Sequence, residues 1–101
     1  MRTIIDNNKL IAEFLGYVQP HPDYPKSTYW YKKDESPLTI LPFNYDWNWL
    51  IQAVIKCKER QFFGSNSLIT RLNNALVQAD IELVYEQVIE FINYYNKQYE
   101  N

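Results

Sequence analysis

The prolines of this chain are gathered in one segment, and their placement limits the possible folds more than any other feature of the sequence. All five prolines lie between Pro20 and Pro42. Proline lacks a backbone N–H and clashes with the preceding helical turn, so a continuous helix is excluded across this segment. The whole chain has 101 residues, and a chain of this length is expected to form a single domain, residues 1–101.

Four segments outside the proline-rich region carry apolar residues at helical spacing. The first follows Asp6 or Asn7, either of which can cap a helix, and it ends at Gly16. The second begins at the capping residue Asp46, and the last begins at Asp80. The pattern predicts helices over about residues 7–16, 46–60, 67–79 and 80–98.

Two stretches of the proline-rich segment have the composition of β-strands. Residues 28–33 contain Tyr29, Trp30 and Tyr31, which are residue types favoured in strands. Residues 38–43 form a second apolar stretch after a short polar turn. We therefore predict a small antiparallel hairpin or sheet packed with the four helices, which is an α+β fold.

Aromatic residues make up 17% of the sequence, which gives a small domain much buried surface per residue. Helical spacing assigns five of these rings to the core, namely Phe14, Trp47, Tyr85, Phe91 and Tyr95. Trp49 and Tyr94 remain unassigned, and Leu83 lies with Tyr94 on the otherwise polar side of the last helix. These three residues are candidates for contact with a protein partner.

The predicted helix over residues 46–60 is apolar on more than one face. Trp47, Leu50, Ile51 and Val54 form its main stripe. This pattern is typical of a helix between two layers, so we expect other helices on one side of it and the hairpin on the other.

Composition and charge disfavour several classes of protein. Ten basic residues against twelve acidic ones give a net charge of −2, which disfavours nonspecific nucleic-acid binding. No apolar run approaches the roughly 18 residues of a membrane span, and no export signal is evident. The single cysteine, Cys57, fits a reducing compartment. We expect a cytoplasmic protein.

Few residues are suited to catalysis. The only histidine, His21, lies two residues before Asp23, whose carboxylate could orient the imidazole, but the prolines around it favour a stiff exposed loop. Cys57 lies in an apolar helical pattern, which favours core packing over a nucleophilic role. Four-ligand zinc sites and glycine-rich phosphate loops are excluded by the counts of Cys, His and Gly. We therefore predict no enzyme activity, no metal site and no cofactor.

One segment has the residue types of an anion-binding or base-binding surface. Lys32 and Lys33 directly follow Tyr29, Trp30 and Tyr31. Aromatic rings beside lysines can stack on bases and neutralise phosphates. If the segment is a strand, however, alternation sends the rings to both faces, and at least one face must be covered. The rings are therefore either core and rim residues or a binding surface.

Three stretches carry a family resemblance. They are residues 8–17 (NKLIAEFLGY), residues 46–50 (DWNWL) with Val54, and residues 80–96 (DIELVYEQVIEFINYYN). In this order they resemble small uncharacterised proteins encoded by phages and prophages of Bacteroidota, with patterns of the type LIAEFMGY, WDWLMPVV and AVYxAVVEFIxWYN. This sequence has Asn48 where the pattern has Asp, and Ile51 and Gln52 where Met and Pro are common.

The resemblance implies kinship and a setting, but no catalytic residues. The layout is more distantly similar to the phage domain named for an α/β/α sandwich, which implies a small sheet flanked by helices. It also implies the cytoplasm of a bacterial host cell. We expect a phage-derived accessory protein that acts by binding a protein partner or a second copy of itself. The alternative is a small-molecule or nucleotide-binding module, for example a sponge for a host defence signal.

Overall fold

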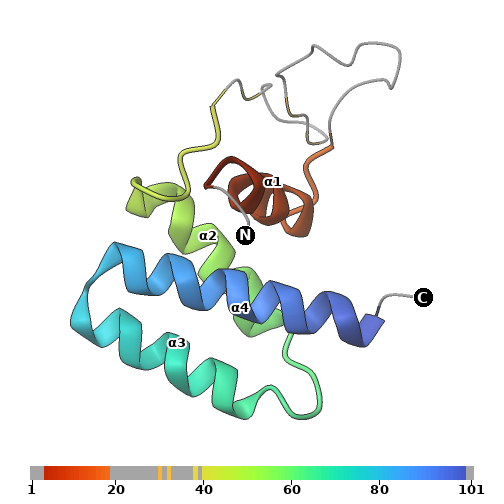
Figure 1. Ribbon diagram of the computed structural model, residues 1–101, viewed down its shortest axis with the longest axis vertical. Coiled ribbons are helices and arrows are strands. Elements are labelled where there is room, and N and C mark those ends of the chain that lie inside the picture. Colours follow the sequence, from red (N-terminus) through yellow and green to blue (C-terminus); the bar gives the residue numbers. More distant parts are fainter. Residues whose placement is uncertain (1–3, 19–29, 31, 33–37, 39, 100–101) are drawn as a thin grey trace.

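The computed structural model describes residues 4–18, 30, 32, 38 and 40–99 (Figure 1). Most of them belong to four helices: α1 (Ile4–Phe14), α2 (Trp47–Glu59), α3 (Asn66–Gln78) and α4 (Ile81–Tyr99). The predicted order of four helices is confirmed, and no helix end differs from its predicted position by more than three residues.

The predicted α+β fold class is wrong, because the described residues form helices and no strand. One isolated antiparallel bridge joins Trp30 and Leu38, whose backbones exchange hydrogen bonds of 2.8 and 2.9 Å. Residues 40–43, the described end of the expected second strand, form no strand. The carbonyl of Pro42 accepts a hydrogen bond of 2.9 Å from the N–H of Asp46, and the chain turns into α2. The small sheet implied by the resemblance is not found in this part of the chain either. Residues 28, 29, 31, 33 and 39 of the expected strands lie outside the described residues.

Helix α4 is the centre of the arrangement, because it contacts each of the other three helices. Figure 1 shows α3 along one side of α4, α1 beyond the other side, and α2 crossing behind it. The prediction that Tyr85 and Phe91 belong to the core is confirmed, and they share the buried face of α4 with Val84, Val88 and Ile92. One amphipathic helix therefore supplies a contact surface for the whole fold.

The helix ends follow from local chemistry. Gly16 has a φ of 95°, and its N–H donates to the carbonyl of Glu13 at 3.0 Å, while the N–H of Tyr17 donates to the carbonyl of Ala12 at 2.9 Å. This pair of hydrogen bonds is the Schellman motif, which requires a left-handed residue where glycine is favoured. The predicted end of the first helix is therefore confirmed.

Two aspartates cap helices as predicted. The carboxylate of Asp46 accepts a hydrogen bond of 2.9 Å from the N–H of Asn48, and that of Asp80 accepts one of 3.0 Å from the N–H of Glu82. Each carboxylate satisfies a backbone donor that has no partner within its helix. The start of α1 is different, because this helix already includes Ile4 and contains Asp6 in its first turn.

An aromatic cluster joins α1, the α2–α3 turn and α4. We define it as Phe14, Phe62, Phe91, Tyr95 and Tyr99. The ring centroids of Phe14 and Tyr95 are 5.5 Å apart, and those of Phe62 and Phe91 are 5.6 Å apart. Most of the contacts are edge-to-face or tilted, the geometry that aromatic quadrupoles prefer. The cluster fixes where these segments meet.

Candidate functional site

Helix α2 is covered on one side only. Its buried residues are Leu50, Ala53, Val54 and Cys57. On the other side, Trp47, Ile51 and Ile55 are exposed to 37%, 40% and 52%. The prediction that Trp47 and Ile51 belong to the core is therefore wrong, and the described residues provide no second layer over this face.

The three exposed side chains form a continuous surface, which we name the α2 ridge (Trp47, Ile51 and Ile55). Residues four apart on a helix are neighbours, and the ridge extends over about 12 Å. Exposed polar residues flank it, namely Asn48, Gln52, Lys58 and Glu59. An apolar centre with a polar rim is the composition of a protein interface.

Trp49 joins α2 to the segment that precedes it. Its ring lies edge-to-face with the ring of Phe43 at a centroid distance of 6.4 Å, and Phe43 is fully buried in the segment before the helix. Trp49 is half-buried and packs against the core. Trp49, a predicted candidate for contact with a partner, is therefore the tryptophan of α2 that packs on the core, and Trp47 is the exposed one.

The two candidate residues of α4 have different environments. Leu83 is partly buried and packs against the core, so its apolar surface is largely used within the chain. Tyr94 is 50% exposed, and the Nζ of Lys97 lies 5.7 Å from its ring centroid. The predicted patch around Leu83 and Tyr94 is thus reduced to one half-exposed ring.

The lysine-rich aromatic segment is described at two of its positions. Trp30 is only 4% exposed, which places its ring in the core rather than on a surface. The Nζ of Lys32 lies 5.3 Å from the ring centroid of Tyr17, a cation–π contact within the chain. The other candidates of this region, Tyr29, Tyr31, Lys33, His21 and Asp23, lie outside the described residues.

Cys57 does not have the environment of a nucleophile. It is fully buried, and burial raises the pKa of its thiol to about 12. A thiol with this pKa stays protonated at neutral pH, and the thiolate is the reactive form.

The described part of the chain contains no group of three or more His, Cys, Asp or Glu residues that could hold a metal ion. None of the four helices is both long enough and apolar enough to span a membrane.

The signal that identifies the α2 ridge is the spacing of Trp47, Ile51 and Ile55, together with a second apolar face on the same helix. The sequence predicted the second apolar face of this helix but assigned it to an internal layer.

Comparison with known proteins does not add a function, because no family model, no curated protein and no solved structure matches this chain. The resemblance to the phage proteins stays a prediction.

Proposed function

We propose that this protein acts by binding, without catalysis, and that the α2 ridge is its binding surface. The observation that carries the proposal is the continuous exposure of Trp47, Ile51 and Ile55 on one helix face. Contiguous apolar surface with a polar rim is typical of protein–protein contacts. A tryptophan at such a surface is the residue type that most often dominates binding energy.

We assign the ridge of a second copy as the occupant, because the ridge is complementary to itself. When two α2 helices pair antiparallel about a twofold axis at Ile51, the two Ile51 side chains meet. Trp47 of each copy then lies against Ile55 of the other. The ridge therefore pairs a large ring with an aliphatic side chain at both ends.

The charges of α2 favour the same antiparallel pairing. Asp46 caps the start of the helix, whereas Lys56 and Lys58 lie in its last turn. Antiparallel pairing places the basic last turn of one helix beside the acidic start of the other, and it also aligns the helix dipoles favourably. A parallel pair would place like charges at the same end.

The test is the molar mass in solution, measured by size-exclusion chromatography with light scattering from about 10 μM to about 1 mM, a range that covers weak dimers. We expect dimers of the unchanged protein and monomers of Ile51→Glu, because the substitution places two carboxylates at the twofold axis. Val77→Glu is the matched control, because Val77 is 86% exposed on α3 and lies outside the ridge. This control should dimerise.

Circular dichroism of each variant checks that its helices are intact, and Ile55→Glu provides a second variant of the ridge. Self-association through α2 is overturned by an unchanged protein that remains monomeric at about 1 mM. It is also overturned by a folded Ile51→Glu variant that dimerises as well as Val77→Glu does.

A further inference from the structure

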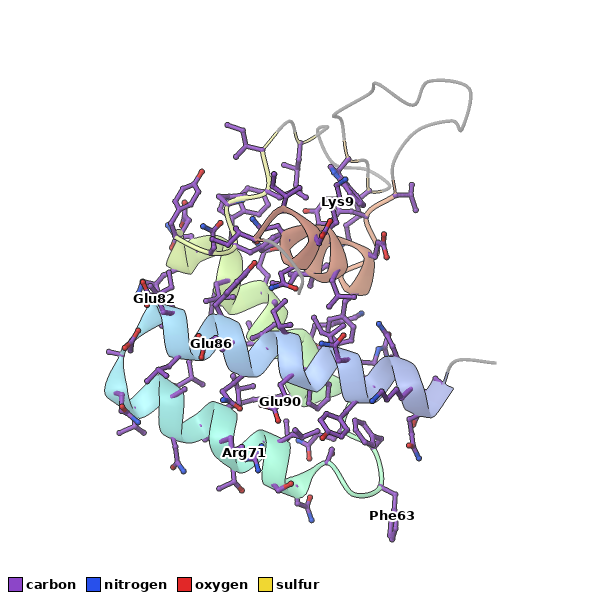
Figure 2. The ribbon with its side chains drawn as sticks, viewed as in Figure 1. Lys9, Phe63, Arg71, Glu82, Glu86 and Glu90 are labelled. Atoms are coloured by element: carbon purple, nitrogen blue, oxygen red, sulfur yellow. The ribbon has the colours of Figure 1, made fainter. Side chains whose placement is uncertain are left out.

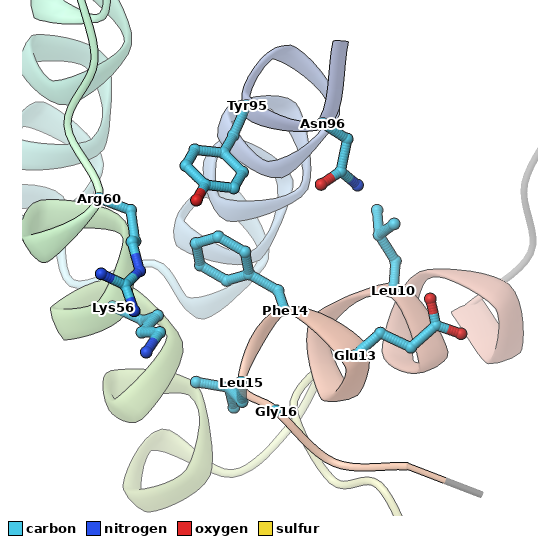
Figure 3. A pocket seen from close by; sticks show the side chains of 9 residues that line it. All are labelled: Leu10, Glu13, Phe14, Leu15, Gly16, Lys56, Arg60, Tyr95 and Asn96. Carbon is cyan, nitrogen blue, oxygen red and sulfur yellow. The ribbon is translucent and has the colours of Figure 1, made fainter. Parts of the chain in front are cut away.

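A pocket of about 400 Å³ opens between α1, α2 and α4 (Figure 3). Its volume lies within the range of small-ligand sites, about 300–1,000 Å³. The residues that give it chemical character are Glu13, Phe14, Lys56, Arg60, Tyr95 and Asn96. Three helices that are distant in the sequence therefore contribute to one concave surface.

One side of the pocket is cationic. Lys56 lies in the last turn of α2 and Arg60 is the residue at its C-terminal cap, and Figure 3 shows both on the same side of the Phe14 ring. Among the described residues, no carboxylate lies within ion-pair distance of either side chain. Lysine and arginine at the C-terminal end of a helix interact favourably with the helix dipole. That interaction alone does not require the head groups of both residues to line the same pocket. The pair offers an anion two charge-assisted contacts.

The middle of the pocket is an aromatic wall. The rings of Phe14 and Tyr95 meet edge-to-face with centroids 5.5 Å apart. Each ring is fixed from behind, Phe14 by Phe91 at 6.3 Å and Tyr95 by Phe62 at 6.3 Å. A planar group can therefore pack against a surface that is already ordered, which lowers the entropic cost of binding.

The other side of the pocket is polar. Figure 3 shows Glu13 and Asn96 on the side of the Phe14 ring opposite Lys56 and Arg60. Glu13 has no ion-pair partner in the described part of the chain. An ionised carboxylate only accepts hydrogen bonds, whereas the amide of Asn96 both donates and accepts. This side therefore favours a ligand edge that carries an N–H donor.

We propose that this pocket binds a mononucleotide whose base carries an exocyclic amine. The phosphate lies between Lys56 and Arg60, which provide an ammonium and a planar guanidinium for its oxygens. The base packs on Phe14 and Tyr95, since aromatic side chains stack on bases. The exocyclic amine donates to Glu13, and no covalent step is involved.

The pocket and the α2 ridge are independent sites. Lys56 lies about 140° from Ile51 around the helix axis, so pairing of two ridges leaves the pocket open. The folded Ile51→Glu variant should therefore bind nucleotide as the unchanged protein does. This result separates failure of the pocket from failure of the dimer.

The experiment is calorimetric titration of the full chain with CMP, UMP and inorganic phosphate. CMP and UMP have the same size, but CMP has an amine where UMP has a carbonyl. We expect CMP to bind about tenfold more tightly than UMP, because the carbonyl faces the carboxylate of Glu13 without a proton between them. Glu13→Gln should remove this preference while retaining binding of UMP.

The cation variants form a matched pair. Lys56→Gln should weaken CMP binding about tenfold or more, through loss of one charge-assisted contact. Lys58→Gln removes the same charge from the same helix turn, but Lys58 does not line the pocket, so CMP affinity should change less than about twofold. The fluorescence and circular dichroism of both variants confirm that they are folded.

Three results would overturn the proposal. The first is the absence of saturable CMP binding up to about 5 mM, the limit of a useful weak site. The second is equal affinity for CMP, UMP and inorganic phosphate, which would define a general anion site without base recognition. The third is an equal effect of Lys56→Gln and Lys58→Gln, which would assign binding to overall charge.

Discussion

The hydroxyl of Tyr85 in α4 donates a hydrogen bond of 2.8 Å to the Oδ1 of Asn8 in α1. The amide nitrogen of Asn8 in turn donates to the Oδ1 of Asn44 at 3.0 Å. Tyr85 and Asn8 are both only 8% exposed, so these contacts take the place of hydrogen bonds to water. They determine how α1 lies on α4 and on the segment before α2.

Tyr85→Phe should lower the free energy of unfolding by about 1–2 kcal/mol, because Asn8 loses its donor inside the protein. Urea denaturation followed by circular dichroism measures the change. Tyr94→Phe is the control, since Tyr94 is half exposed and its hydroxyl makes no hydrogen bond with another described residue. Equal stability of Tyr85→Phe and the unchanged protein would show that the hydrogen bond contributes nothing.

Stability should fall in alkaline solution. Burial raises the pKa of Cys57 from 9.0 to about 12 and that of Tyr85 from 10.0 to about 12. Above pH 9.0 the unfolded chain loses these protons before the folded chain does, so the free energy of unfolding decreases as pH rises toward 12. Well below pH 9.0 these two groups are protonated in both states and contribute no pH dependence.

The slope of the free energy of unfolding against pH identifies the group responsible. In Cys57→Ala the decrease should begin near pH 10.0, where Tyr85 starts to ionise in the unfolded chain, instead of near pH 9.0. The substitution also removes a buried sulfur, so the slope rather than the absolute stability is compared. An identical slope in both proteins would contradict the role of Cys57.

The left-handed residues at two helix ends should respond to substitution in opposite directions. Gly16 has a φ of 95° and Ala79 a φ of 54°. Gly16→Ala should lower the free energy of unfolding by about 1 kcal/mol, because a Cβ disfavours this backbone conformation. Ala79→Gly should raise it by about 0.5 kcal/mol for the same reason. Chemical denaturation of the pair tests both signs, and a change in the same direction would refute the argument.

Two adjacent phenylalanines should differ sharply in their contribution to stability. Phe62 packs in the aromatic cluster, 5.6 Å from Phe91, whereas Phe63 is 99% exposed and points away from the helices (Figure 2). The turn is fixed because the N–H of Phe62 donates to the Oγ of buried Ser65 at 3.0 Å and the N–H of Ser65 donates back to the carbonyl of Phe62 at 2.9 Å.

Phe62→Ala should lower the free energy of unfolding by about 2 kcal/mol through lost apolar burial. Phe63→Ala should change it by less than about 0.5 kcal/mol, as expected of an exposed site. Thermal and urea unfolding of the two variants provide the comparison. A larger loss for Phe63→Ala than for Phe62→Ala would mean that the two rings exchange places in solution.

An ion pair on the surface joins α3 and α4. Arg71 of α3 donates to Glu90 of α4 at 2.8 Å, and the guanidinium side chain is 58% exposed (Figure 2). Exposed pairs of this kind contribute roughly 0–1 kcal/mol. The acidic series Glu82, Glu86 and Glu90 on α4 is accordingly a solvated helix face with one inter-helix contact.

The helices and their ends were predictable because their causes are local. The caps at Asp46 and Asp80, the left-handed glycine at Gly16 and the buried stripe of α4 depend on residues a few positions apart. Hydrogen bonds to the first turn and a helical apolar period act within one segment. No knowledge of the other helices was needed for these features.

The sequence by itself determined the four helices, their order and which face of α4 is buried. Only the tertiary structure decided that Trp49 packs inward on Phe43 while Trp47 is exposed, because both rings are apolar and burial depends on what each one meets. It also decided that residues 40–43 lead into α2 instead of forming a strand, with the Pro42 carbonyl accepting a hydrogen bond from the N–H of Asp46. The pocket has the same origin, because Glu13 and Lys56 come together only through the packing of α1 and α2 around α4.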